Sequence, residues 1–150
     1  MKKEPIYFWD KDLGYAEVQI FYKNLKLTGI AECHPDDRDM MSQMMGLTIA
    51  EIRATLAYLR HIRDNELKPQ LKALYQLYYS VNQSDQYEEN NYHVIMLKRQ
   101  ISNTEEDLKN IRKQISNLKE SLFRYMREKA ELHQHLREKR AKGQEGLITQ

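Results

Sequence analysis

The sequence predicts a mainly α protein with a small β part, in which an N-terminal β-hairpin is followed by a long antiparallel helical hairpin that forms a coiled coil. Three observations predict this fold. Apolar residues recur at alternating steps of three and four from Val94 to Leu136, and polar and apolar residues alternate over residues 15–22. The polar residues 82–91 have no periodicity and therefore form the loop between the two helical arms. A content of 31% charged against 41% hydrophobic residues suits a rod that is nearly all surface.

The N-terminal part is expected to form the β-hairpin. Apolar and polar residues alternate from Ala16 to Ile20, which is the period of a half-buried strand. Residues 23–24 provide the turn to a second strand that ends near Cys33. The short aromatic run at residues 6–9 predicts a third strand. Because an isolated hairpin is only marginally stable, the strands are expected to lean on the helices.

A Met-rich turn completes the first predicted domain, residues 1–46. Proline and two aspartates favour a turn at residues 34–37. Four methionines follow within residues 40–45, and Gly46 ends the segment. These methionines either point into the core or, as the alternative, form an adaptable surface for a partner.

The second predicted domain, residues 47–142, is the antiparallel coiled-coil hairpin. Thr48 and Glu51 fit a capping box, so the first helix is expected over about residues 48–64. Apolar residues then follow heptad spacing along this helix. The seam of apolar residues predicts that the helix is covered by a second one.

The apolar phase slips by one residue after the first helix. Asn65 can cap a new helix, and Pro69 would then lie in its first turn, where a missing N–H costs nothing. We therefore predict a kink or break between residues 63 and 68 and a second helix over about residues 66–82.

The third helix is expected over about residues 91–141, followed by a frayed tail at 143–150. Lys129 lies at a core position of the heptad, which costs stability and often sets register or oligomeric state. The heptads pair either within one chain or between chains, so a homodimer or higher homo-oligomer is expected. The a and d positions are Val94, Leu97, Ile101, Thr104, Leu108, Ile111, Ile115, Leu118, Leu122, Tyr125, Lys129, Leu132 and Leu136.

Charge and cysteine content favour the cytoplasm. The net charge is +2, which demands neither a nucleic acid nor a membrane as partner. The chain has one cysteine, no apolar region typical of a signal peptide, and no run of 18 apolar residues. The simplest expectation is a reducing compartment.

Candidate metal ligands gather in one segment, but they are too few for a zinc site and lack the spacing of a calcium loop. We expect a turn with capping aspartates and a buried cysteine, and no metal or cofactor. His133 and His135 are expected to be solvated positions beside the seam. No catalytic triad or phosphate-binding loop is recognisable, so the protein is expected not to be an enzyme. The segment's candidate ligands are Cys33, His34, Asp36, Asp37 and Asp39.

Two surfaces are candidates for binding. The first is a protein-binding end that carries aromatic anchors and acidic residues. The alternative is a nucleic-acid-binding site at the basic end of the third helix, where acidic residues are interleaved. The predicted protein-binding residues are Tyr7, Phe8, Trp9, Phe21, Tyr22, Asp36, Asp37 and Asp39. The predicted nucleic-acid-binding residues are Arg124, Arg127, Arg137, Lys139, Arg140 and Lys142.

Residues 27–54 resemble a pattern in small proteins of Gram-positive phages and mobile elements. The pattern is Gly-x-Ala-x-Cys-His-Pro-x-Asp, then Gly, Ile-Ala and Arg-Ala, and here it covers Gly29 to Asp37, Gly46, residues 49–50 and residues 53–54. The resemblance implies only a setting, namely a phage or prophage accessory protein in a bacterial cytoplasm. In that setting, the predicted protein-binding end leads us to expect a non-enzymatic interaction protein that binds and modulates, or inhibits, a host or phage protein. The resemblance implies no catalytic residue.

Overall fold

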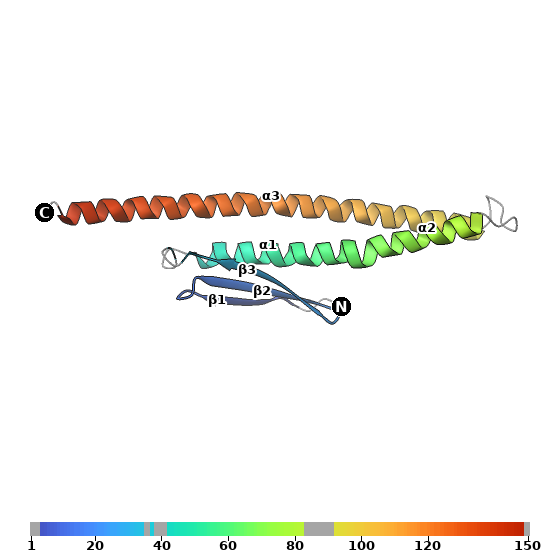
Figure 1. The fold of residues 1–150 in the computed structure, drawn as a ribbon, viewed down its shortest axis with the longest axis horizontal. Coiled ribbons are helices and arrows are strands. Elements are labelled where there is room, and N and C mark those ends of the chain that lie inside the picture. The colour runs from blue at the N-terminus through green and yellow to red at the C-terminus, as the bar shows by residue number, and fades with distance from the viewer. Residues whose placement is uncertain (1–3, 35–36, 38–41, 83–91, 149–150) are drawn as a thin grey trace. The chain divides into compact units, whose positions relative to one another are not determined.

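The computed structural model describes residues 4–34, 37, 42–82 and 92–148, with side chains up to residue 143. The described chain is mainly helical (74%), with a three-stranded antiparallel sheet at the N-terminus followed by helices (Figure 1). Residues 1–58 and 118–150 form one compact unit, the sheet unit, and residues 59–117 form a second, the helical unit. None of the described helices combines the length and apolarity that a membrane span requires.

The sheet has the order β1-β2-β3, with strands β1 (Ile6–Asp10), β2 (Tyr15–Tyr22) and β3 (Leu25–Glu32). The aromatic run at residues 6–9 therefore extends the predicted hairpin to three strands. The alternation in β2 is confirmed, because Ala16, Val18 and Ile20 are buried and the residues between them are half-exposed.

Helix α1 (Gln43–Ile62) covers the buried face of the sheet. Ile49, Ala50 and Ala54 are almost completely buried and belong to the same core cluster as Val18 and Ile20. Small residues bring the two backbones close together at β3. Gly29 is buried there, and a Cβ atom at its position would lie 2.0 Å from the Ala50 carbonyl oxygen.

The predicted start of this helix at Thr48 is wrong. The Ser42 Oγ accepts the Met45 N–H at 3.4 Å and caps a helix that begins at Gln43. The Thr48 hydroxyl instead donates to the Met44 carbonyl at 2.7 Å, inside the helix. Gly46 lies buried within α1 and does not end a segment, because packing against the sheet outweighs its low helix propensity.

The Met-rich turn is described in part. Met45 packs against the core, whereas Met44 is 79% exposed. Met40 and Met41 lie outside the described residues.

The helical unit contains the predicted phase slip. The chain does not break there but makes a π-helical turn, η2 (Arg63–Leu67), and continues as α2 (Lys68–Asn82). Asp64 is exposed and accepts from Arg63 and Lys68, which hold its pKa at about 2. Pro69 is the second residue of α2, which follows the π-helical turn directly, so the irregular turn lies where a proline without an N–H interrupts the backbone hydrogen bonds.

Within this unit, α2 and the first part of α3 (Tyr92–Ile148) run in opposite directions. The Gln70 amide donates to the Thr104 hydroxyl at 3.5 Å, and the Tyr75 hydroxyl donates to the Glu105 carboxylate. Farther along α2, Leu77 and Val81 lie in one groove with residues 93–100. The predicted seam is buried here at Val94, Leu97, Ile101, Thr104 and Leu108.

Helix α3 extends beyond its predicted end near residue 141 and reaches Ile148, so the tail is helical where fraying was expected. A single glycine, Gly143, costs a helix only about 1 kcal/mol and does not stop it. Of the predicted loop at residues 82–91, Asn82 is the last residue of α2, and residues 83–91 lie outside the described residues.

The part of α3 in the sheet unit buries a different face from the one the heptads predict. Leu122 and Tyr125 pack against the core as expected. Farther on, Leu132 is 36% exposed, whereas the next residue, His133, is 4% exposed. In a straight α-helix, residues seven apart differ in direction by about 20°, so a seam with a strict seven-residue repeat turns gradually around the helix. After about four heptads this rotation is about 80°, close to the roughly 100° between neighbouring residues. The buried position therefore moves to the next residue in the chain.

Candidate functional site

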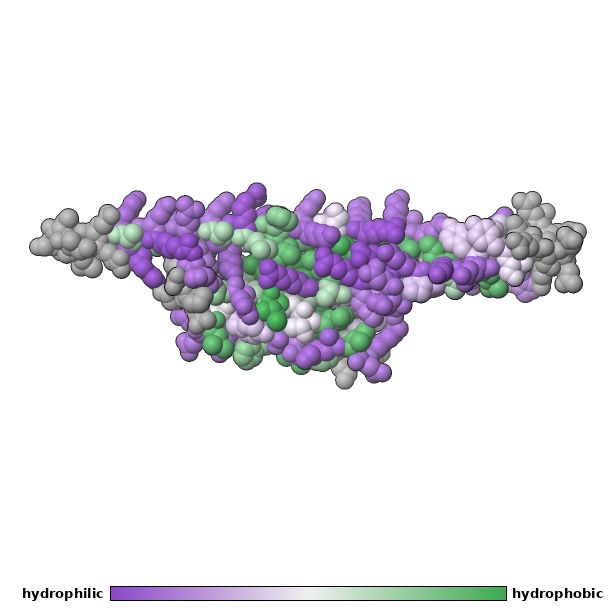
Figure 2. Space-filling model, viewed as in Figure 1, coloured by the Kyte–Doolittle hydropathy of each residue, from purple (hydrophilic) through white to green (hydrophobic). Residues whose placement is uncertain are grey.

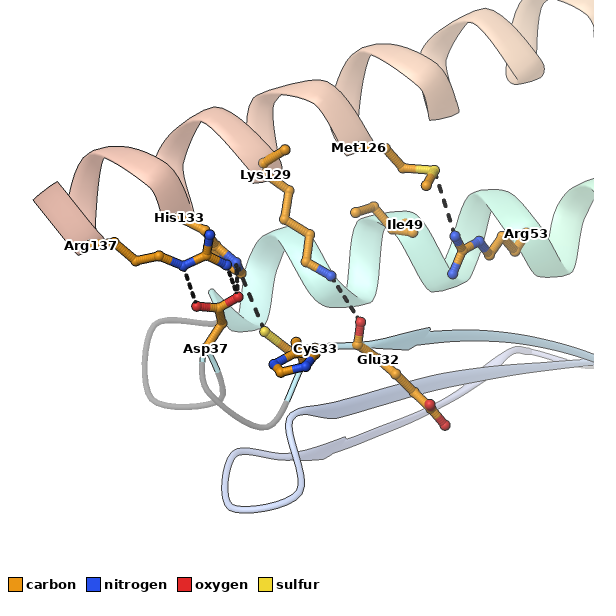
Figure 3. A pocket seen from close by; sticks show the side chains of 11 residues that line it. Glu32, Cys33, Asp37, Ile49, Arg53, Met126, Lys129, His133 and Arg137 are labelled. Carbon is orange, nitrogen blue, oxygen red and sulfur yellow. Dashed lines mark hydrogen bonds and ion pairs between the residues drawn. The ribbon is translucent and has the colours of Figure 1, made fainter.

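A pocket lies in the sheet unit, where the end of β3 and the segment after it meet α1 and α3 (Figure 3). Its volume is about 340 Å³. Its lining combines acidic, basic and thiol groups with a few apolar side chains. The lining residues are Glu32, Cys33, His34, Asp37, Ile49, Arg53, Met126, Lys129, Ala130, His133 and Arg137.

Three buried side chains meet at one end of the pocket. The Cys33 sulfur lies 3.9 Å from Nδ1 of His133, and an Asp37 carboxylate oxygen lies 4.0 Å from the same nitrogen. Short backbone bonds hold the segment after β3 in place: the Cys33 N–H donates to the Gly14 carbonyl at 2.9 Å and the Asp37 N–H to the His34 carbonyl at 2.8 Å. Cys33 and Asp37 thus meet a histidine that lies 100 residues after Cys33 in the chain.

Asp37 forms a two-fold ion pair with Arg137. The guanidinium Nε donates to one carboxylate oxygen at 2.8 Å, and Nη2 donates to the other. The Asp37 side chain is 4% exposed and the Arg137 side chain 57%. The hydrogen bonds from Arg137 outweigh the effect of burial and lower the pKa of Asp37. Asp37 therefore carries a negative charge inside the unit.

Two further cations hold the end of β3 through its backbone carbonyls. Lys129 Nζ donates to the Glu32 carbonyl at 3.1 Å, and an Arg53 nitrogen donates to the Ile30 carbonyl at 2.6 Å. Burial lowers the pKa of Lys129. The unusual core position of Lys129 in the heptad is thus explained by a carbonyl that needs a donor.

His133 is buried beside these charges. Burial lowers its pKa below the ordinary value of 6.5, and the attraction of Asp37 only partly opposes this effect. The imidazole is therefore neutral near pH 7. Within the described part of the chain, its Nε2 is a buried nitrogen without a hydrogen-bond partner, which costs about 1–3 kcal/mol.

The stability of the sheet unit is expected to fall as the pH drops below about 6.5. Unfolding exposes His133 and returns its pKa to the ordinary value, so below pH 6.5 the unfolded chain binds more protons than the native state does. The stability term is complete above pH 6.5 and is lost as the pH falls toward the lowered native pKa of His133, with a slope of up to about 1.4 kcal/mol per pH unit for one proton. The low pKa of Asp37 adds a loss of the same sign below about pH 3.8.

Urea unfolding of chelator-treated protein, followed by the fluorescence of Trp9 between about pH 7.5 and 5, checks this expectation. His133→Gln should flatten the pH dependence, whereas His135→Gln should preserve it, because His135 is exposed. Equal slopes in both variants would contradict the assignment to His133.

The side chains of Cys33 and Asp37 face the same nitrogen of His133, which is not the arrangement of a catalytic triad. In a nucleophilic triad the thiol and the carboxylate lie at opposite nitrogens of the imidazole. Here both Cys33 and Asp37 face Nδ1 of His133. Cysteine, aspartate and histidine placed in this way have the chemistry of metal ligands.

The sequence identified two of these three residues. Cys33 is buried as expected, but Asp37 pairs with Arg137 and does not cap a turn. The prediction that His133 is solvated is wrong, whereas His135 is exposed. The only sequence signal for His133 was its position one residue after Leu132, a predicted seam residue. That position is buried because the heptad positions turn gradually around the helix.

The predicted protein-binding residues differ in how far they are exposed. Tyr7 and Phe8 are each 49% exposed, and Trp9 is half-buried and packs against the core. Phe21 and Tyr22 are half-buried. Asp37 is buried in its ion pair and is not presented to a partner, because a lone buried carboxylate needs the Arg137 charge. The predicted Asp36 and Asp39 lie outside the described residues.

The predicted basic surface has less positive charge to offer a nucleic acid than its list of arginines and lysines indicates. Arg137 is engaged with Asp37, and Glu128, Glu131 and Glu138 are exposed among the remaining cations. Alternating signs weaken the one-sided field that phosphate binding requires. The other predicted residues are exposed on α3: Arg124, Arg127, Lys139, Arg140 and Lys142.

The sequence matches no known family model, and no curated protein or solved structure is significantly similar to it.

Proposed function

We propose that the protein is a non-enzymatic protein–protein interaction module that binds through the outer face of its sheet, the face opposite α1. The observation that carries this proposal is the exposure of apolar side chains there: Ile6 is 53% exposed, Phe8 49% and Ile30 38%. The strand register places Phe8 and Ile30 on either side of Glu17. We name this surface the outer apolar face, and its residues are Ile6, Phe8, Tyr15, Phe21 and Ile30.

The outer apolar face has the composition of a binding surface. The rings of Phe8 and Tyr15 make an edge-to-face contact with centroids 6.0 Å apart. Glu17 accepts hydrogen bonds from Tyr15 at 3.1 Å and from Gln19 at 3.0 Å, so a charged centre lies among apolar groups. Figure 2 shows hydrophobic residues gathered over the strands. Rigid aromatic anchors around a fixed polar group favour a protein surface that offers apolar and basic side chains.

We further propose that α1 and α2 pair with α3 as an antiparallel coiled-coil hairpin that carries the sheet. The burial of the predicted a and d residues between Val94 and Leu108 supports this pairing, as do the contacts of α2 with α3.

The resemblance of residues 27–54 supports the setting of this proposal. The partner is a bacterial or phage protein in the host cytoplasm, and the module modulates or inhibits it. A homodimer or higher homo-oligomer is a separate expectation, because it would form through heptads that pair between chains and not through the outer apolar face.

Site-specific photocrosslinking tests the proposal. Phe8→benzoylphenylalanine, expressed in a Gram-positive bacterium, should give a discrete adduct with one protein, and Ile30→Asp in the same chain should abolish it. The matched control is Phe123→benzoylphenylalanine, because Phe123 is 80% exposed on α3 in the same unit. An adduct of twice the chain mass would identify a second copy as the partner. No adduct at position 8, or the same adducts at both positions, would refute the outer apolar face as the binding surface.

A further inference from the structure

Three side chains with different metal-binding groups point at one spot at the end of the pocket (Figure 3). Cys33 offers a thiolate, Asp37 a carboxylate and His133 an imidazole nitrogen, and the three ligand atoms lie within 4.8 Å of one another. All three residues are buried, and His133 reaches the spot from a helix 100 residues away from Cys33. Folding, and not sequence proximity, assembles the group.

The spacing of the three atoms fits an ion better than it fits direct bonds. The 4.0 Å between the Asp37 oxygen and His133 Nδ1 exceeds a hydrogen bond. In a tetrahedral zinc site, with Zn–S of about 2.3 Å and Zn–N of about 2.0 Å, neighbouring ligand atoms are about 3.5 Å apart. Around an ion, the contact of 3.9 Å between sulfur and nitrogen therefore needs to shorten by about 0.4 Å, and the contact of 4.0 Å between oxygen and nitrogen by about 0.7 Å.

The surroundings supply what such a site requires. Arg137 orients the Asp37 carboxylate from outside, as ligating carboxylates are usually held by a hydrogen-bonded neighbour. A thiolate and a carboxylate together neutralise a divalent cation, and Lys129 is occupied by the Glu32 carbonyl. His133 is 4% exposed. Its Nδ1 faces the Cys33 sulfur at 3.9 Å, a long hydrogen-bond contact, and the Asp37 carboxylate at 4.0 Å, whereas its Nε2 has no partner among the described residues.

We propose that Cys33, Asp37 and His133 bind one divalent transition-metal ion of the zinc class, with the fourth coordination position open to the pocket. The thiolate and imidazole favour zinc or cobalt over magnesium and calcium, which prefer oxygen ligands. The ion fastens the segment after β3 to α3. The proposal is independent of the outer apolar face, which lies on the other side of the sheet.

Cobalt titration of the chelator-treated full chain tests the site. Co²⁺ should bind at one ion per chain and give the near-ultraviolet thiolate-to-cobalt charge-transfer band with the strong visible bands of a tetrahedral ion. Zn²⁺ should displace it and Mg²⁺ should not. Cys33→Ser should remove the charge-transfer band, and His133→Asn should weaken binding at least about tenfold. His135→Asn is the matched control on the same helix and should bind as the unchanged chain does.

Zn²⁺ should also raise the melting temperature of the unchanged chain and of His135→Asn, but not that of Cys33→Ser. If His133→Asn fails to fold, the spectrum and stoichiometry of the unchanged chain still decide the matter. A chain without the charge-transfer band, a band that persists in Cys33→Ser, or equal losses in the two histidine variants would each overturn the proposal.

Discussion

Gly29→Ala is expected to lower the unfolding free energy of the sheet unit by at least about 3 kcal/mol, the upper range for overpacking a core. The new Cβ would lie 2.0 Å from the Ala50 carbonyl oxygen and 2.3 Å from the Ala54 nitrogen. Both atoms belong to the backbone of α1, so no side-chain rotation relieves the clash. The sheet and α1 must separate, and the buried core between them opens.

Urea unfolding followed by the fluorescence of Trp9 measures this loss, because Trp9 is the one tryptophan and packs against the core of this unit. Gly143→Ala is the matched control. Its Cβ would meet nothing within 4 Å, and alanine in a helix should stabilise by up to about 1 kcal/mol. Two glycine variants of equal stability would contradict the close approach of β3 to α1.

Leu108→Ala is expected to cost about 2–5 kcal/mol, whereas Leu132→Ala should cost less than about 1 kcal/mol. Both leucines lie on α3 at core positions of the predicted heptad repeat, so the sequence predicts that both are buried. Leu108 is 3% exposed and Leu132 is 36% exposed. Truncation leaves a cavity only at the first position.

Thermal and urea unfolding followed by far-ultraviolet circular dichroism compares the two variants. His133→Ala in the same series should lose more stability than Leu132→Ala, although histidine is the more polar residue. Equal losses at Leu108 and Leu132 would show that the heptad seam continues unchanged, and the burial of His133 would then be wrong.

The strands and the existence of the helices could be read from the sequence because their signals are local. Two-residue alternation from Ala16 to Ile20 and three-to-four spacing after Val94 each arise within one element. The helix boundaries could not be read as well. Two capping signals compete in one segment: Ser42 caps the helix that begins at Gln43, whereas Thr48 bonds to the Met44 carbonyl inside it. Local pattern alone does not choose between them.

The candidate site could be predicted only in part for the same reason. Cys33 and Asp37 lie close together in the sequence, and their chemistry marked the segment. His133 and Arg137 were placed elsewhere, one as a solvated flank and one as part of a basic surface. No local pattern joins residues 100 positions apart, so their meeting depends on how α3 lies against the end of β3.

The sequence by itself determined the small N-terminal sheet, the long helices and the need of each apolar stripe for a covering partner, because periodicity and propensity act over a few residues. Tertiary structure alone decided which face of α3 is buried beside the sheet, and with it the conversion of His133 and Lys129 from rod-surface and seam positions into pocket residues. The physical reason is that the heptad positions turn slowly around a straight α-helix. At the far end of α3 the heptad therefore no longer fixes the buried face, and the surface that packs there sets it.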